Sequence, residues 1–148
     1  MSRTNNRKTA FLEAVTERQK FVENSKDYIR FNFKYYIYGD DGGESFEDWE
    51  KEQILADLNN KIRDFSAKTK RELINEKTLE LFSHYPQDSK FKKPKALQEL
   101  NIIWARLRIT GARRLIGFFM NLEDKENTFY VVFLDKNHMF APYTKKNT

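Results

Sequence analysis

The residues best suited to chemistry in this chain are two arginines and a histidine in its last third, Arg108, Arg114 and His138. The unperturbed pKa of histidine lies close to neutrality, so an imidazole can accept and return a proton, and guanidinium groups bind phosphate. RNA cleavage by attack of a 2′-hydroxyl on its own phosphate requires proton removal, proton delivery to the leaving oxygen and positive charge beside the phosphorane. These three residues can supply all of this, and we predict them as catalytic, with no metal and no other cofactor.

Cationic and aromatic side chains accompany these residues in the sequence. Single-stranded nucleic acid is held by such a mixture, through attraction of its backbone and stacking of its bases. The predicted RNA-binding residues are Arg106, Arg113, Lys136, Phe140, Tyr143, Lys92 and Lys93. The competing interpretation is a solvated strand edge that happens to be basic, with His138 as an incidental surface residue. His84 is interpreted as incidental in either case.

Three apolar-rich segments, residues 102–109, 114–122 and 129–134, have to position the predicted catalytic residues. Short turns separate them, so we predict an antiparallel meander, in which the end of the first strand, the start of the second and the end of the third share one edge. Alternation in the first strand predicts that Ile103, Ala105, Leu107 and Ile109 face the core, whereas Trp104, Arg106 and Arg108 face outward.

The chain before the meander begins with a helical pattern and then changes period. Residues 8–24 place apolar side chains at helical spacing, and residues 28–38 alternate as a strand does. Residues 39–43, which read Gly-Asp-Asp-Gly-Gly, are a strong signal for chain reversal. We therefore predict a helix, a strand and a turn.

Two capping boxes indicate where the next helices begin. Ser45 with Asp48, and Thr69 with Glu72, have the three-residue spacing of that motif. The apolar pattern predicts one helix from about 46 to 65 and a shorter or broken one continuing to Phe82, together a helical hairpin. Residues 83–100, with two prolines and several lysines, predict an irregular basic connection. The predicted fold class is α+β: N-terminal helix, strand, helical hairpin and three-stranded antiparallel meander.

Composition limits the class of protein. A length of 148 residues with 39% hydrophobic and 15% aromatic residues predicts a single domain with an aromatic-rich core, carrying an N-terminal helical extension over about residues 1–26. The absence of cysteine excludes disulfides and thiol nucleophiles, and no phosphate-binding glycine loop, GxSxG or HExxH motif is present. The sequence contains no apolar run of membrane-span or signal-peptide length, so we expect a cytoplasmic protein without a membrane partner.

Charge is unevenly distributed along the chain, whose net charge is +5. Residues 1–38 carry 8 Lys/Arg and 4 Asp/Glu, residues 39–80 carry 7 and 12, and residues 81–148 carry 12 and 6. A basic region attracts phosphate backbones, and an acidic region can mask it or repel a wrong partner. The alternative is a mixed, solvated surface without a partner.

The acidic residues offer weaker candidates. Asp135 could pair with Arg108 or Arg114, could cap the strand end, or could orient His138, and the structural roles are favoured. The acidic group Asp40, Asp41, Glu44, Glu47 and Asp48 lacks the spacing of a calcium loop, and we interpret it as a solvated turn and helix start.

Two stretches of the chain resemble a known family. Residues 104–119, WARLRITGARRLIGFF, and residues 129–138, FYVVFLDKNH, resemble the strands of the RelE/ParE toxin superfamily. The resemblance covers about residues 28–143 and implies a strand, two helices and a three-stranded meander with a basic site at the sheet. It also implies that Arg114 contacts the scissile phosphate, that Arg108 supports it, and that His138 with Phe140 is the C-terminal histidine and aromatic pair.

The leading hypothesis is therefore a toxin-like, metal-independent endoribonuclease that cleaves mRNA, with RNA or the ribosome as its target and an antitoxin protein as its partner. One alternative is a non-catalytic RNA- or protein-binding module on the same fold, for which His138 would be dispensable. A third hypothesis is a protein-interaction module built around the acidic segment 40–57, which would have no affinity for nucleic acid.

Overall fold

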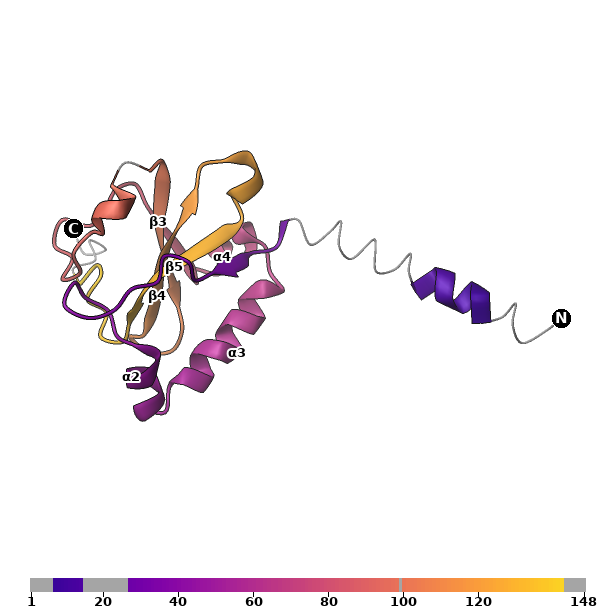
Figure 1. The fold of residues 1–148 in the computed structure, drawn as a ribbon, viewed down its shortest axis with the longest axis horizontal. Coiled ribbons are helices and arrows are strands. Elements are labelled where there is room, and N and C mark those ends of the chain that lie inside the picture. The colour runs from indigo at the N-terminus through magenta and orange to yellow at the C-terminus, as the bar shows by residue number, and fades with distance from the viewer. Residues whose placement is uncertain (1–6, 15–26, 99, 143–148) are drawn as a thin grey trace.

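The protein is a mixed α/β structure in which helices cover a five-stranded sheet, as a computed structural model shows (Figure 1). The structure describes residues 7–14, 27–98 and 100–142. The strands are β1 (Arg30–Asn32), β2 (Leu79–Phe82), β3 (Ile102–Arg108), β4 (Arg114–Met120) and β5 (Thr128–Asp135). The helices are α2 (Phe46–Lys51), α3 (Leu55–Ser66) and α4 (Lys70–Asn75), with short 3-10 turns at Lys95–Leu97 and Glu123–Lys125.

The order of strands across the sheet is β1-β5-β4-β3-β2. Strands β2 to β5 follow one another as antiparallel neighbours, and β1 lies parallel to β5 at the far edge. The three strands expected over 102–134 are therefore present, in the expected antiparallel order. The β4 and β5 registers shift between Ile116 and Gly117, where a β-carbon on Gly117 would lie 2.1 Å from the carbonyl oxygen of Tyr130. Only glycine permits this close approach.

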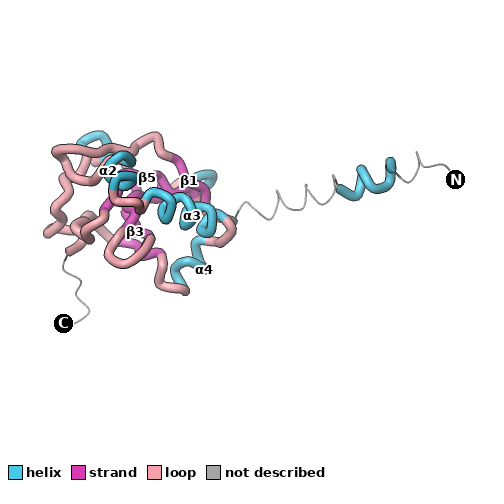
Figure 2. The backbone as a smooth tube through the Cα atoms, turned by 90° about the horizontal axis from the view of Figure 1, so that it is seen from below, coloured by secondary structure: helices cyan, strands magenta, loops and turns pink. Residues whose placement is uncertain are grey.

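Both predicted capping boxes are formed. The Ser45 and Thr69 hydroxyls accept hydrogen bonds from the backbone of Asp48 and Glu72, whose carboxylates accept bonds in return. The single helix expected over about 46–65 is wrong, however, because α2 ends and α3 begins on either side of a break in which Gln53 has a φ of 62°. Of the helix expected over 8–24, residues 7–14 are helical and the rest lies outside the described residues (Figure 2).

Residues 79–82 form the edge strand β2, so the expectation that the second helix continues to Phe82 is wrong. Helix α4 ends at Asn75, and Lys77 takes a φ of 65° that turns the chain back. Strand β2 then pairs along β3, from Leu79 opposite Leu107 to Phe82 opposite Trp104. The sheet therefore extends one strand further than predicted.

The strand expected over 28–38 is only three residues long. Phe31 and Tyr36 pack against the core beneath the helices, whereas Tyr35 and Ile37 pack against the core on the opposite face. Residues 31–37 therefore contribute side chains to both cores from the edge of the sheet. The irregular connection expected over 83–100 is confirmed, apart from the 3-10 turn.

Two hydrophobic cores cover the two faces of the sheet. One lies beneath the helices and includes Trp49, Leu58 and Leu107; the other is largely aromatic and includes Trp104, Phe118 and Phe140. The expectation that Trp104 and Arg106 face solvent is wrong because the chain after β2 and the chain after β5 cover that face, and both side chains are buried. Ala105, Leu107 and Ile109 face the helical core as expected.

Candidate functional site

A cleft of about 560 Å³ lies where α4 meets the ends of β2, β3 and β4. Its lining combines cationic groups, one carboxylate and apolar side chains: Ile74, Lys77, Leu79, Glu80, Leu81, Arg106, Arg108, Arg114 and His138. The three predicted catalytic residues thus line one cleft. They come from the end of β3, the start of β4 and the turn after β5, as the predicted meander requires.

Arg108 and Arg114 are directly opposite each other in the β3–β4 ladder. The Nη1 atom of Arg114 donates hydrogen bonds to the carbonyl oxygens of Gly111 at 2.7 Å and Arg113 at 2.9 Å, which fixes the guanidinium against the turn. Burial is the main cause that lowers the pKa of Arg114, and the charges of Arg106 and Arg108 add to it. These crowded cations create a positive potential that favours an anionic ligand such as a phosphate.

Arg106 is buried in the wall of the cleft and bound to Glu80. Its Nη2 lies 2.5 Å from Glu80 Oε1, and its Nη1 donates to the Ala141 carbonyl oxygen at 3.4 Å. The guanidinium also lies over the ring of Phe82, 5.4 Å from its centroid. The Arg106 side chain is 6% exposed and that of Glu80 52% exposed. The carboxylate of Glu80 is therefore held at a fixed position yet remains accessible from the cleft.

His138 is held in an unusual backbone conformation by the turn that follows β5. Its φ is 61°, which is rare for a residue other than glycine and signals a constrained site. The fully buried carboxylate of Asp135 accepts hydrogen bonds from the backbone N–H of Met139 at 2.8 Å and of Phe140 at 2.9 Å. Asp135 therefore caps the strand end, which was one of the roles considered for it, and shapes the turn that presents His138.

The environment of His138 favours its neutral form. Partial burial lowers the pKa of the imidazole, and the charges of Arg106 and Arg114 lower it further, whereas Asp135 opposes the shift. A neutral imidazole can accept a proton from a hydroxyl group. A negatively charged phosphate in the cleft would raise the pKa again and favour return of the proton.

The predicted RNA-binding residues are not all gathered at the cleft. Arg113 donates to the Thr110 hydroxyl within the β3–β4 turn, and Lys136 forms an ion pair with Glu52 on the side facing α2. Lys92 and Lys93 lie in the loop before β3, away from the cleft lining. Tyr143 lies outside the described residues.

Phe140 is fully buried and is not available to stack on a base, which corrects its predicted role. Its ring contacts those of Phe82, Tyr85 and Trp104 at centroid distances of 5.2 to 5.9 Å. Phe140 therefore anchors the turn that carries His138. The loop after β2, which supplies Tyr85, completes this aromatic cage.

Sequence reasoning missed Glu80, Lys77 and the apolar wall formed by Ile74 and Leu81. The signal was present, because residues 79–82 read Leu-Glu-Leu-Phe, an alternation typical of a short strand. With that strand placed beside β3, Glu80 falls opposite Arg106.

Glu44 is a structural carboxylate, so its interpretation as part of a solvated turn is wrong. Its Oε1 accepts hydrogen bonds from Trp49 Nε1 at 2.9 Å and from the Lys136 backbone N–H at 2.7 Å. Its own backbone pairs with Leu134. Burial raises the pKa of Glu44. Through these two hydrogen bonds, Glu44 links α2 to the end of β5.

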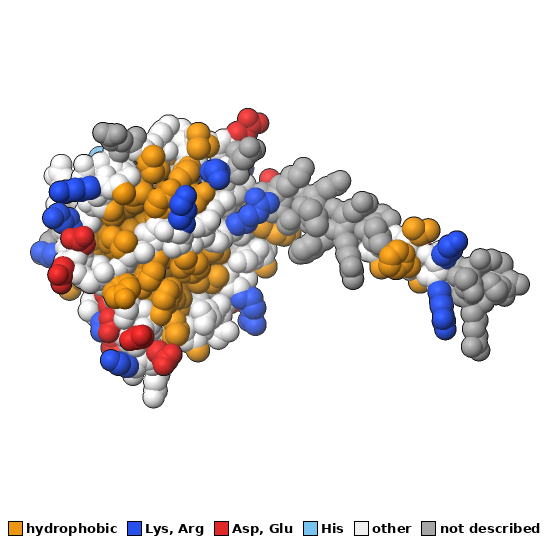
Figure 3. Space-filling model, in the orientation of Figure 1, with side chains coloured by type: hydrophobic (Ala, Val, Ile, Leu, Met, Phe, Trp, Pro, Cys, Tyr) orange, Lys and Arg blue, Asp and Glu red, His pale blue; other side chains and the backbone are white. Residues whose placement is uncertain are grey.

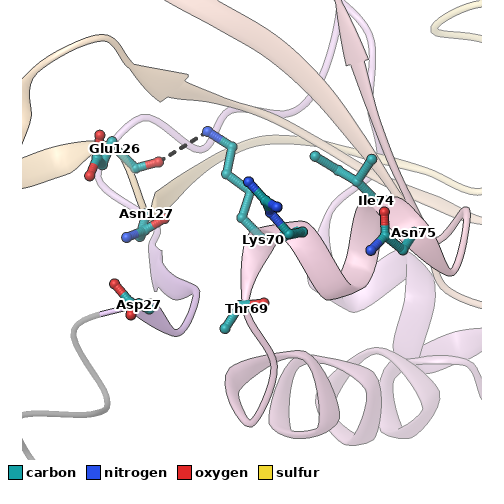
Figure 4. A pocket seen from close by; sticks show the side chains of 8 residues that line it. Asp27, Thr69, Lys70, Ile74, Asn75, Glu126 and Asn127 are labelled. Atoms are coloured by element: carbon teal, nitrogen blue, oxygen red, sulfur yellow. Dashed lines mark hydrogen bonds between the residues drawn. The ribbon is translucent and has the colours of Figure 1, made fainter.

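A second, larger hollow of about 750 Å³ lies between α4 and the turn before β5 (Figure 4). Lys70 extends across it and donates to the Glu126 carbonyl oxygen at 3.2 Å, with its Nζ 4.1 Å from the Phe119 ring centroid. Burial lowers the pKa of Lys70. None of the predicted catalytic residues lines this hollow, and Lys70 is already engaged with the protein. The cleft beside Arg114 is the better candidate site despite its smaller volume.

Among the residues that the structure describes, no three His, Asp or Glu side chains are grouped so as to hold a metal ion. No helix within the described ranges is long and apolar enough to cross a membrane. No protein-family model matches this chain, and neither a curated protein nor a solved structure is significantly similar to it.

Proposed function

We propose that this protein is a toxin-like endoribonuclease that cleaves mRNA in the cleft beside Arg114, possessing the RelE-like fold that its strand sequences resemble. The observation that carries the proposal is the convergence of Arg106, Arg108, Arg114 and His138 around one cleft, with the Glu80 carboxylate on its wall. Cations that surround an accessible carboxylate and an imidazole form a site suited to phosphodiester chemistry.

In the proposed reaction, the 2′-oxygen of a ribose attacks the adjacent phosphorus while the bond from phosphorus to the 5′-oxygen breaks. The products are a 2′,3′-cyclic phosphate and a 5′-hydroxyl. Arg108 and Arg114 bind the phosphate and stabilise the phosphorane. Glu80, held as a carboxylate by Arg106, accepts the proton of the 2′-hydroxyl. His138, whose imidazolium form the bound phosphate favours, donates a proton to the departing 5′-oxygen.

The arrangement of the chain gives the RelE-like proposal further support. Strand β1 precedes the helices in the chain, and it pairs with β5, the last strand of the antiparallel series. The proposed context follows the family resemblance: a cytoplasmic toxin that acts on ribosome-bound or free mRNA and is neutralised by an antitoxin.

The test is tightly controlled induction in bacteria, with growth and RNA integrity followed for the wild type, Arg114→Ala and His138→Ala. Arg63→Ala is the matched control, because Arg63 is exposed on α3 and pairs only with its neighbour Asp64 among the contacts described. Growth arrest with discrete mRNA cuts in the wild type and Arg63→Ala, lost in the other two, supports the proposal. Binding of RNA without cuts would support the non-catalytic module instead.

A further inference from the structure

Four aromatic side chains form a continuous row on the face where the chain runs from β1 to α2. We call this row the aromatic ladder: Phe33, Phe46, Tyr36 and Tyr38, in order of contact, with ring centroids 5.9, 4.7 and 6.0 Å apart. Phe33 is 41% exposed and Tyr38 64% exposed. Figure 3 shows hydrophobic side chains gathered across this face. Phe46 and Tyr36, the two middle rings, are partly buried against the core beneath the helices. A row of rings with exposed ends offers aromatic surface of the kind that binding sites use.

Acidic residues predominate in the segment that carries the ladder. Residues 33–52 contain 7 Asp/Glu and only 2 Lys, and acidic side chains group near α2 at the lower edge of the same view (Figure 3). Burial raises the pKa of Tyr36 to about 12, with smaller contributions from Tyr38, Asp48 and Glu44. Aromatic faces and carboxylates both attract cations, so the ladder fits a cationic segment with apolar side chains.

The N-terminal segment of this chain has that chemistry. Residues 1–26 contain 6 Lys/Arg against 3 Asp/Glu, with Phe11, Leu12 and Val15 at helical spacing. Residues 7–14 are helical, and Phe11 is 68% exposed. Isolated helices shorter than about 12 residues are marginal in water. A helix of this length gains stability when it packs its apolar side against another surface.

We propose that the aromatic ladder is a docking surface for the chain's own basic N-terminal helix. Phe11 then packs against the rings, and Arg7 and Lys8 lie toward the acidic side chains near α2. The chain length permits this: 13 residues separate Ala14 from Tyr28, and extended chain spans about 3.3 Å per residue, or about 40 Å. The proposal is independent of the endoribonuclease activity.

The test exploits the absence of cysteine from the sequence. A nitroxide is attached to the single cysteine of Ala10→Cys in the full-length chain, and the broadening of backbone amide signals is mapped by NMR. Docking predicts a several-fold loss of signal intensity at Phe33, Tyr38 and Phe46. Unchanged intensity at these positions would overturn the proposal.

Variants separate docking from chance proximity. Phe11→Ser or Tyr38→Ser in the labelled chain should restore most of the lost intensity, whereas Leu122→Ser, at an exposed apolar residue outside the ladder, should not. The double reversal Arg7→Glu with Lys8→Glu should also restore it. Broadening that survives Phe11→Ser would contradict the proposal. Docking onto a second copy is tested by mixing spin-labelled and unlabelled chains. If the signals of the unlabelled chains broaden in the mixture, and a diluted labelled chain shows no broadening of its own signals, the helix docks on a second copy and docking within one chain is overturned.

Discussion

Glu80 and Arg106 lie opposite each other in the β2–β3 ladder, and their side chains form an ion pair with 2.5 Å between Oε1 and Nη2. The pair joins a buried guanidinium to a carboxylate that is half exposed in the cleft. This arrangement fixes the carboxylate in the cleft that Arg114 and His138 also line, within a ligand's reach. The proposed acid and base chemistry depends on that combination.

Glu80→Gln is expected to lower the rate of RNA cleavage by about 100-fold, because an amide cannot exchange the proton. Stability should fall by only about 1 kcal/mol, since the carboxylate is half exposed and Gln can still accept a bond from Arg106. Glu76→Gln, which alters an exposed ion pair with Lys68, is the matched control. Cleavage by Glu80→Gln at the wild-type rate would exclude Glu80 from the reaction.

The positive φ of His138 predicts that a side chain at this position lowers the stability of the turn, although the imidazole is needed for cleavage. Both His138→Ala and His138→Gly should abolish cleavage, but the glycine variant should be more stable than the alanine variant by about 1 kcal/mol, because a β-carbon is disfavoured at this φ. Urea unfolding of the two variants measures the difference. Equal stabilities would show that the turn is not strained at His138.

Asp135→Asn is expected to destabilise the protein by about 2 kcal/mol, because either the part-buried N–H of Met139 or the buried N–H of Phe140 loses its acceptor. The turn should then hold His138 less firmly, so cleavage should fall more than RNA binding. Denaturant unfolding and cleavage rates at saturating RNA measure the two effects. A loss of less than about 0.5 kcal/mol would show that the carboxylate does not organise the turn.

The lowered pKa of His138 predicts a titration midpoint below 6.5, observable by NMR of its imidazole after assignment with His84→Gln. Below pH 6.5 the unfolded chain takes up this proton before the folded chain does, so His138 makes stability fall as the pH falls. Arg114→Gln should raise the midpoint only in part, because burial is the larger cause. A midpoint above 6.5 in the wild type would contradict this environment.

The meander and the helix starts could be predicted from the sequence because their signals are local. Ser45 and Thr69 carry the capping spacing within four residues, and the apolar segments from Ile102 onward are separated by recognisable turns. That meander also predicted that Arg108, Arg114 and His138 would line one site.

The remaining features depend on contacts between distant segments. Strand β2 is stabilised by pairing of Leu79 and its neighbours with residues of β3 more than 20 positions away. The alternation over residues 79–82 is a local sign of this strand, but four residues are too few to exclude a continuation of the preceding helix. Phe140 is buried because the loop containing Tyr85 folds over it. Glu80 reaches the cleft because β2 pairs with β3, and Arg106 is buried because the chain after β2 and the chain after β5 cover that face of the sheet.

The central claim is tested most directly by incubating the purified protein with mRNA, free and on translating ribosomes, and mapping the ends of the products for the wild type and Arg114→Ala. The proposed reaction predicts 5′-hydroxyl and 2′,3′-cyclic phosphate ends in the wild type, reduced at least about 100-fold in a folded Arg114→Ala variant. Products with other ends, cleavage that survives Arg114→Ala, or intact RNA in both reactions would contradict the proposed site.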